Sequence, residues 1–261
     1  MTPGGYYAWV KREKSARQLE NEALLIEIKC IHDKSDQTYG YLRVHAALRR
    51  QGIVCGKHRV ARLMRENGIV GKKARRFKKH KHRHHLMQNS QNLLLNREPV
   101  TSKNEVWVGD ITFIKVNKEW SYLSVVMDLH TRKILGWTFD KKRSADMVSE
   151  SLIMAANDNK HTSSTIFHSD QGSEYASRKY ISELNNRNIK PSMSRKGHCW
   201  DNAYMESFFH SLKTEMIYFN HFKTLEEATA YIIDYIYFYN HERLHSSLGY
   251  QTPAEYERIV A

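Results

Sequence analysis

The first seventy residues show helical periodicity and no strand pattern. Within residues 15–31, apolar positions recur at spacings of four, three and four residues: Leu19, Ala23, Ile26 and Cys30. This period predicts an amphipathic helix that buries that stripe. Two shorter helical patterns follow: one starts at Tyr41 and breaks at Gly52, and the other starts near Lys57 and closes at Gly68.

The third of these helices carries a row of arginines opposite its apolar side. Its inward positions are Val60, Leu63 and Met64, and its outward arginines are Arg59, Arg62 and Arg65. Two short helices joined by residues 52–56, the second rich in arginine, are typical of a helix-turn-helix whose second helix enters the DNA major groove. A small structural helical bundle would show the same pattern, so both interpretations stay open at this point.

From residue 105 onward the pattern changes to strands. Three runs rich in β-branched and aromatic residues, at 106–116, 122–129 and 134–139, are separated by short turns and predict an antiparallel meander. Further elements follow: a helix through Met147, Leu152 and Ala155, a strand at 165–168, a helix at 180–188, a strand around Ser192, and helices at 201–217 and 225–240. This order predicts a mixed sheet with helices on its faces.

The last long helix is densely aromatic, and its aromatic residues are Tyr231, Tyr235, Tyr237, Phe238 and Tyr239. We interpret this stripe as core or subunit contact in preference to a base-stacking platform, because such stripes at helical spacing usually pack inward.

Composition excludes several classes of protein. The 261 residues are 41% hydrophobic, enough for at least one core, yet no run of about eighteen apolar residues predicts a membrane span. Charged residues occupy positions 11–13, where a signal peptide needs its apolar stretch, so we expect a cytoplasmic protein. The cysteines Cys30, Cys55 and Cys199 lie far apart, which favours reduced thiols over disulfides or a zinc ribbon.

The net charge of +13 is concentrated in the first part of the chain. Residues 1–100 contain 22 basic and 8 acidic side chains, whereas residues 101–261 contain 19 and 20. Such a basic arm is typical of a polyanion binder, most often a nucleic-acid binder.

Residues 72–85 alone hold eight Lys or Arg and four His. This block repels itself, so we interpret it as a linker that becomes ordered on phosphate. The expected phosphate contacts are Lys72, Lys73, Arg75, Arg76, Lys78 and Lys79. Metal binding by the four histidines is disfavoured because the flanking cations oppose a divalent ion.

Three carboxylates stand out in the second part. Asp110 lies inside the first predicted strand among apolar neighbours, Asp170 ends the fourth strand, and Glu206 lies on the helix that Asp201 can cap. Desolvation destabilises a strand carboxylate unless a cation meets it. Three carboxylates from separate elements can hold the two divalent ions that catalyse phosphoryl transfer, because these ions bind carboxylate oxygens. A glycosidase would use only two carboxylates and would not explain the basic arm. The chain contains fifteen tyrosines, so their number does not exclude an enzyme with a tyrosine nucleophile. Such an enzyme would leave Asp110 without a role.

Several motifs resemble the integrase core of bacterial insertion-sequence transposases, and most closely the second reading-frame product (OrfB) of the third-numbered insertion-sequence family. The matching motifs are Trp107-Val108-Gly109-Asp110-Ile111-Thr112, His168-Ser169-Asp170-Gln171-Gly172-Ser173-Glu174-Tyr175, Ser194-Arg195-Lys196-Gly197, and Trp200-Asp201-Asn202-Ala203 followed by Glu206-Ser207-Phe208-Phe209. The segments Tyr39-Gly40-Tyr41-Leu42-Arg43 and Tyr239-Asn240-His241-Glu242-Arg243 are similar to that family's helix-turn-helix and C-terminal signatures. The resemblance covers residues 38–257.

The resemblance implies a ribonuclease-H-like α/β fold: a mixed five-stranded sheet with flanking helices, preceded by an all-helical helix-turn-helix domain. It implies a catalytic and metal-binding triad of Asp110, Asp170 and Glu206, two Mg²⁺ or Mn²⁺ ions, and hydrolytic nicking followed by strand transfer. The expected partners are double-stranded DNA, further copies of the chain and an upstream first-frame (OrfA) product. We add Arg195 and Lys196 to the expected DNA contacts.

We therefore predict a helix-turn-helix domain at 1–71, a basic linker at 72–104, a catalytic core at 105–218 and a helical extension at 219–261. The predicted function is that of a DNA transposase acting at the bacterial nucleoid. Two rivals stay open: a non-catalytic DNA-binding regulator of transposition and a stand-alone ribonuclease-H-like nuclease. The intact triad counts against the first, and the basic N-terminal arm counts against the second.

Overall fold

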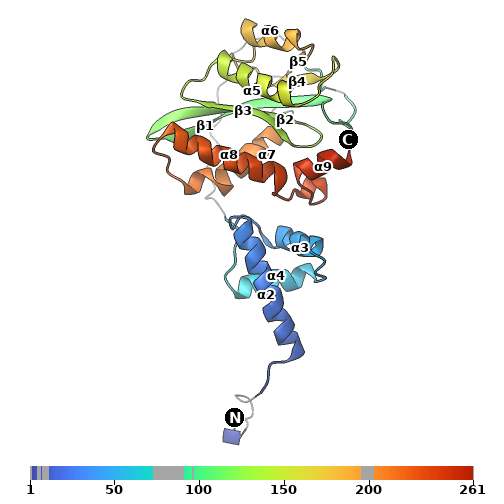
Figure 1. Cartoon of the computed structure of the whole chain (residues 1–261), viewed down its shortest axis with the longest axis vertical. Helices are drawn as coiled ribbons and strands as arrows, with labels where there is room; N and C mark the ends of the chain where they lie inside the picture. The colour runs from blue at the N-terminus through green and yellow to red at the C-terminus, as the bar shows by residue number, and fades with distance from the viewer. Residues whose placement is uncertain are drawn as a thin grey trace. The chain divides into compact units, whose positions relative to one another are not determined.

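A computed structural model describes residues 2–4, 7, 12–72, 91–95, 97–194 and 203–260. The chain forms two compact units, Met1–Lys73 and Ala74–Ala261 (Figure 1). Within the described ranges, no helix combines the length and the hydrophobicity needed to cross a membrane.

The first unit contains the helices α2 (Ala16–Lys34), α3 (Tyr41–Arg50) and α4 (Lys57–Glu66). Ser15 caps α2 in a capping box with Gln18, so the backbone donors of the first turn are satisfied. Positive φ angles at Gly52 (81°) and Gly68 (65°) end the two shorter helices where the sequence predicts. The inward side of α4 is confirmed, since Val60, Leu63 and Met64 are buried.

The predicted inward stripe of α2 is wrong. Leu19, Ala23, Ile26 and Cys30 are all exposed, and the buried apolar side chains are Leu24, Ile28 and Ile31. Both stripes have helical spacing, so periodicity alone does not choose between them. Packing against α3 and α4 decides which stripe is buried. Arg59 of α4 also ties α2 in place, because it donates to Asn21 Oδ1 at 2.7 Å and to Glu20 Oε2 at 3.1 Å.

The second unit is built on a five-stranded sheet in the order β3-β2-β1-β4-β5. Its strands are β1 (Val106–Val116), β2 (Glu119–Asp128), β3 (Ile134–Asp140), β4 (Ile166–Ser169) and β5 (Lys190–Met193). The first three form the predicted antiparallel meander. Strand β4 pairs in parallel with β1, and β5 pairs in parallel with β4, so the sheet is mixed as predicted.

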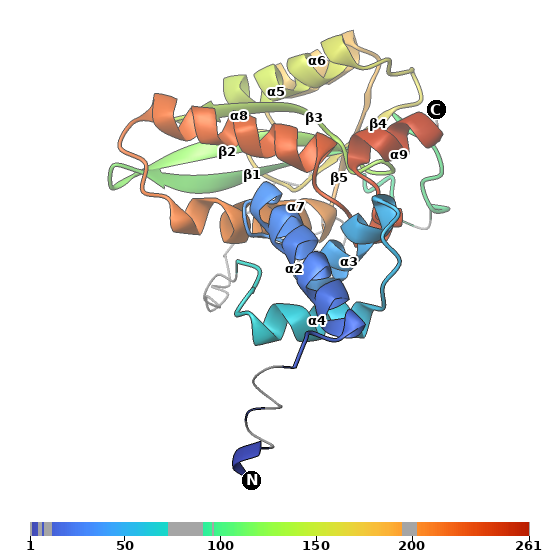
Figure 2. The ribbon, with the colours of Figure 1, turned by 60° about the horizontal axis from the view of Figure 1, so that its bottom comes forward.

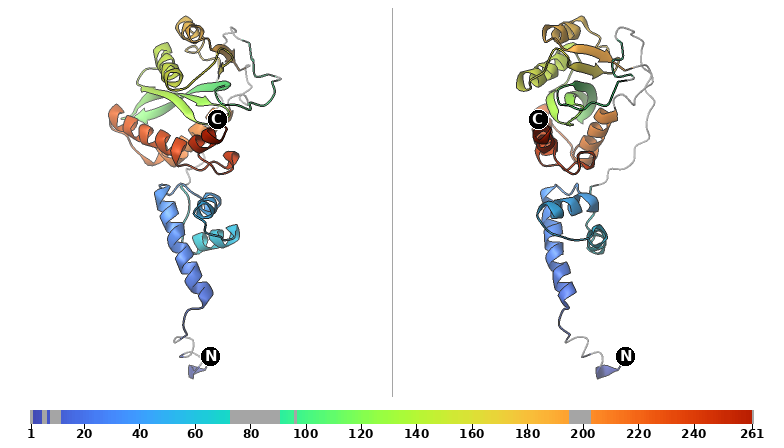
Figure 3. Two further views of the ribbon diagram at one scale, coloured as in Figure 1. Left: turned by 45° about the vertical axis from the view of Figure 1, so that its right-hand side comes forward. Right: turned by 90° about the vertical axis from the view of Figure 1, so that its right-hand side faces the viewer.

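Helices cover both faces of this sheet (Figures 1 and 3). One face carries α5 (Ala145–Asp158) and α6 (Arg178–Asn186), and the other carries α7 (Ala203–Glu215) and α8 (Leu225–His241). Figure 2 shows α8 crossing the sheet with α9 (Pro253–Ile259) beyond its end. The sequence pattern did not predict α9 or the 3₁₀ turns Ile217–Phe219 and Ser246–Leu248.

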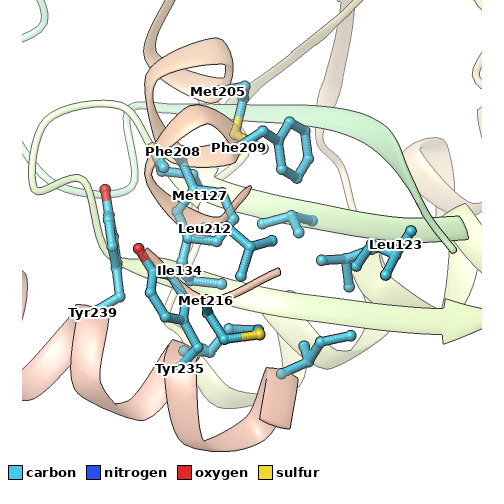
Figure 4. Packing of buried hydrophobic residues seen from close by; sticks show 14 of the residues in the cluster. Leu123, Met127, Ile134, Met205, Phe208, Phe209, Leu212, Met216, Tyr235 and Tyr239 are labelled. Carbon is cyan, nitrogen blue, oxygen red and sulfur yellow. The ribbon is translucent and has the colours of Figure 1, made fainter. Parts of the chain in front are cut away.

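Strand alternation divides the core into two halves. On β1, Val106 and Val108 pack toward α7 and α8, while Trp107 packs toward α5 and α6. In the larger half, Tyr235 and Tyr239 of α8 point toward the side chains of α7 above the sheet (Figure 4). One side of the aromatic helix therefore packs in the core, as predicted, whereas Tyr231 and Tyr237 are exposed.

Two glycines allow the close packing of the other half. A Cβ atom at Gly109 would lie 2.4 Å from the Phe167 ring, and one at Gly136 would lie 2.2 Å from the Ser151 carbonyl oxygen. Only glycine leaves room for these neighbours.

Candidate catalytic site

The register of two parallel strands brings Asp110 and Asp170 level with each other. Strand β1 pairs with β4 from Val106↔Ile166 to Val108↔His168. Continuing this register by two residues sets Asp110 opposite Asp170, which follows directly after the end of β4. Alternation from Val108 and Ile166 assigns both residues to the sheet face that α7 covers.

Asp110 is half-buried, and its Oδ1 accepts a hydrogen bond from the Ile111 backbone N–H at 2.8 Å. The pKa of Asp110 is raised from 3.8 to about 7; burial is the largest cause, and the charges of Asp170 and Glu206 contribute to the increase. The Ile111 hydrogen bond and the charge of Arg143 oppose it. The raised pKa of Asp110 therefore reflects the electrostatic repulsion between the three predicted carboxylates as well as burial.

Asp170 begins a tight turn in which its Oδ1 accepts from the Gly172 backbone N–H at 2.9 Å. A Cβ atom at Gly172 would lie 2.9 Å from Asp170 Oδ1 and 3.2 Å from both Arg143 Nη2 and Glu174 Oε2. Arg143 Nη2 donates to Glu174 Oε2 at 2.8 Å. An ion pair that the sequence pattern did not reveal thus lies directly beside Asp170.

Glu206 lies in the first turn of α7 and is exposed. The buried side chains of Met205, Phe208 and Phe209 hold this end of the helix against the sheet (Figure 4). The three carboxylates come from a strand, a strand end and a helix, as predicted. Among the described residues, no three His, Cys, Asp or Glu side chains lie close enough together to hold a metal ion.

Lys213 is a further cation of the site that the sequence-based prediction missed. It lies seven residues after Glu206 on α7, and two turns of a helix bring such residues to the same side. Burial lowers the pKa of Lys213, while the charge of Asp110 opposes the decrease. The spacing of seven residues was a signal available in the sequence.

Comparison with known proteins agrees with this architecture. The integrase core domain family matches residues 100–199, a second integrase core domain family matches residues 187–253, and an HTH-like domain family matches residues 18–77. The transposase InsF of insertion sequence IS3A from Escherichia coli K12 is 36% identical over 256 residues, which covers 97% of this chain and 89% of that protein. The chain belongs to the IS3 family of transposases.

Other IS3-family relatives span the chain to a similar extent. The transposase of IS904 from Lactococcus lactis is 37% identical and covers 95% of this chain and 98% of its own length. A 31 kDa protein of insertion element IS600 from Shigella sonnei is 36% identical, covering 97% and 93%. These matches favour transposition over the regulator and the stand-alone nuclease.

A solved structure supports the fold of this IS3-family transposase. The intasome of simian T-cell lymphotropic virus in complex with PP2A regulatory subunit B56 gamma aligns with a TM-score of 0.54 at 16% identity, over 88% of this chain and 74% of that one. The ribonuclease-H-like fold is thereby confirmed, and the match of the HTH-like domain family to residues 18–77 confirms the N-terminal helix-turn-helix domain.

The residues of the transposase that are predicted to contact DNA differ in their surroundings. On α4, Arg59 is bound to α2, Arg62 pairs with Glu66 at 3.0 Å, and Arg65 is exposed. Lys72 donates to Asp36. The others lie outside the described residues, as does the proposed cap Asp201: Lys73, Arg75, Arg76, Lys78, Lys79, Arg195 and Lys196. All of these DNA contacts stay predictions.

Proposed function

We propose that this transposase nicks the ends of its insertion sequence and joins them to target DNA in a metal-dependent reaction, with Asp110, Asp170 and Glu206 as the catalytic triad. One observation carries the proposal: the strand register sets Asp110 level with Asp170, and the charges of Asp170 and Glu206 add to the raised pKa of Asp110. A folded domain gains no stability from carboxylates that repel one another, so their convergence indicates a site for cations.

The chemistry of the donor set fits a hard divalent cation, and holding one would require the three side chains to draw closer together than they lie in this structure. Carboxylate oxygens are the ligands that Mg²⁺ and Mn²⁺ prefer, and bound cations would remove the repulsion that now acts on Asp110. Asp110, Asp170 and Glu206 would hold these ions, of which we propose two. When bound, such ions supply charge stabilisation for the attacking and leaving oxygens of a phosphodiester.

The remaining side chains of the site suit a DNA substrate. Arg143 and Lys213 place two cations next to the carboxylates, where they would neutralise phosphate oxygens and orient the strand. In this mechanism water attacks in the nicking step and a DNA 3′-hydroxyl attacks in the joining step. The chain itself supplies no nucleophile.

The proposed function also includes an assembly of several copies of the chain on DNA. Joining two element ends to one target requires several copies of the chain on the DNA, and an upstream first-frame partner would contribute further end recognition. We place this activity on the chromosomal DNA of the bacterial nucleoid.

The triad is tested with Asp110→Asn, Asp170→Asn and Glu206→Gln in the full chain. Each change removes a cation ligand and should lower nicking and joining of labelled element-end DNA about a thousandfold or more. DNA affinity in a chelator should stay unchanged. Glu150→Gln, an exposed carboxylate on α5, is the matched control and should keep full activity. Normal nicking by Glu206→Gln in Mg²⁺ would contradict the assignment.

A further inference from the structure

Two exposed aromatic rings lie side by side at the outer part of the β1–β2 hairpin. Phe113 is 43% exposed and Trp120 is 53% exposed, although most neighbouring strand residues are buried. Their ring centroids are 5.0 Å apart in an edge-to-face arrangement. The register pairs Phe113 with Tyr122 and Lys115 with Trp120, so both rings occupy the same face of the sheet.

Two lysines lie over these rings. Lys213 Nζ is 4.6 Å from the centre of the Phe113 ring, and Lys115 Nζ is 6.0 Å from the centre of the Trp120 ring. Within the described residues, neither lysine forms an ion pair with a carboxylate at hydrogen-bonding distance. The patch thus alternates flat apolar faces with ammonium groups that remain available to an anion.

The patch adjoins the candidate catalytic site. Strand β4 pairs with β1 only as far as Val108, and the next pairing on that edge among the described residues is the bridge of Val116 with Phe222, so residues 109–115 have no strand partner there. Lys213 comes from α7 and interacts both with the charge of Asp110 and with the ring of Phe113. By strand alternation the two rings lie on the opposite side of β1 from Asp110, and Lys213 reaches over the edge of β1 between the two sides. A substrate strand that leaves Asp110 across this edge would meet the rings.

We propose that Phe113, Trp120, Lys115 and Lys213 form a stacking platform for an unpaired base of the DNA strand next to the reacting phosphate. The inference rests on the proposed function. Base faces stack on aromatic rings, and phosphates pair with lysines, which matches the alternation in this patch. In an intact duplex the base faces are covered by their neighbours, so the platform requires a base that has left the stack at the element end. A carboxylate-rich protein would satisfy the lysines but would leave the exposed ring faces without a planar partner.

The experiment uses the full chain in a chelator with two probes that carry 2-aminopurine at the element end. One probe is a forked duplex with a short unpaired flap, and the other is the same end fully paired. Stacking quenches 2-aminopurine, so the wild-type chain should quench the flap probe strongly and the paired probe little. Phe113→Leu and Trp120→Leu should abolish the quenching and weaken binding of the forked probe about fivefold to a hundredfold.

Matched variants separate stacking from folding and from general affinity. Tyr237→Leu removes another exposed ring, on α8, and should change neither signal. Lys115→Gln should reduce the salt slope of binding to the forked probe by about 0.7. Thermal unfolding of each variant checks that the fold is retained.

Two outcomes would overturn the platform. If the wild-type chain binds the forked probe but quenching survives both ring substitutions, the platform is wrong while the proposed function stands. If the chain does not bind element-end DNA in either form, the proposed function fails together with it.

Discussion

At the scale of single residues, Asp110 is the group whose ionised form the fold disfavours most clearly. Its neighbours on β1 are apolar, and Asp170 is level with it across the strand register. An acid whose pKa is raised in the folded state binds a proton more tightly when folded than when unfolded. The free energy of unfolding therefore falls as pH rises from about 4 to about 7.

Asp110→Asn removes this penalty. We expect the variant to exceed the wild-type chain in stability only slightly at pH 4.5 and much more at pH 8, by at most about 4 kcal/mol for a shift of this size and by less because Asp110 is partly exposed. Thermal unfolding in a chelator at the two pH values measures the difference. Added Mg²⁺ should stabilise the wild-type chain more than the variant. A gain that is equal at both pH values would contradict the raised pKa.

At the scale of elements, a buried ion pair joins α7 to the segment that follows α8. Glu215 accepts from Arg243 at 2.6 and 2.8 Å, and Tyr235 donates to the same carboxylate at 2.9 Å. The side chains of the pair are 9% and 4% exposed. The helix that presents Glu206 to the sheet is thus tied at its other end to the C-terminal signature. Nearby, Asn240 makes two hydrogen bonds with the backbone of Ile134 and ties the end of α8 to β3.

Arg243→Leu should destabilise the second unit by about 3–5 kcal/mol because it leaves the Glu215 carboxylate buried without its partner. The double variant Glu215→Leu with Arg243→Leu should lose less than the sum of the two single changes. Urea unfolding of the full chain, followed by tryptophan fluorescence, measures both. Lys179→Ala breaks an exposed pair with Asp146 and should lower the free energy of unfolding far less than Arg243→Leu does. If the losses in free energy of unfolding of the two single variants simply add up in the double variant, the pair does not act as a unit.

At the scale of the whole molecule, charge and chemistry are divided between two parts of the chain. The basic excess lies in residues 1–100, and the three carboxylates lie in the second unit. In the proposed function, phosphate contacts set affinity and its salt dependence, whereas the carboxylates carry the reaction. We therefore expect DNA affinity and catalysis to respond to different substitutions.

Replacing Lys72, Lys73, Arg75, Arg76, Lys78 and Lys79 by Ala should flatten the dependence of log affinity on log salt by up to about 0.9 for each phosphate that the chain no longer neutralises. The preference for element-end over random DNA should change little. Fluorescence anisotropy at several salt concentrations tests this with the full chain. The control variant replaces three exposed lysines of the second unit by Ala: Lys160, Lys190 and Lys223. It should alter the salt slope less per residue. An unchanged slope in the linker variant would refute its role.

The sequence by itself determined the strands of the sheet, most of the helices and the family, and it predicted the three carboxylates as the site. Strand β1 begins and ends where its β-branched run does, and the motifs around Asp110, Asp170 and Glu206 already indicated the family. These features are local, since a strand or helix pattern depends on residues a few positions apart. Tertiary structure decided which of two equivalent stripes α2 buries, and it brought Lys213, Phe113 and Trp120 together from three elements. It also paired Glu215 with Arg243, 28 residues apart. These contacts depend on how distant segments pack, and packing is a property of the whole core that no local period records.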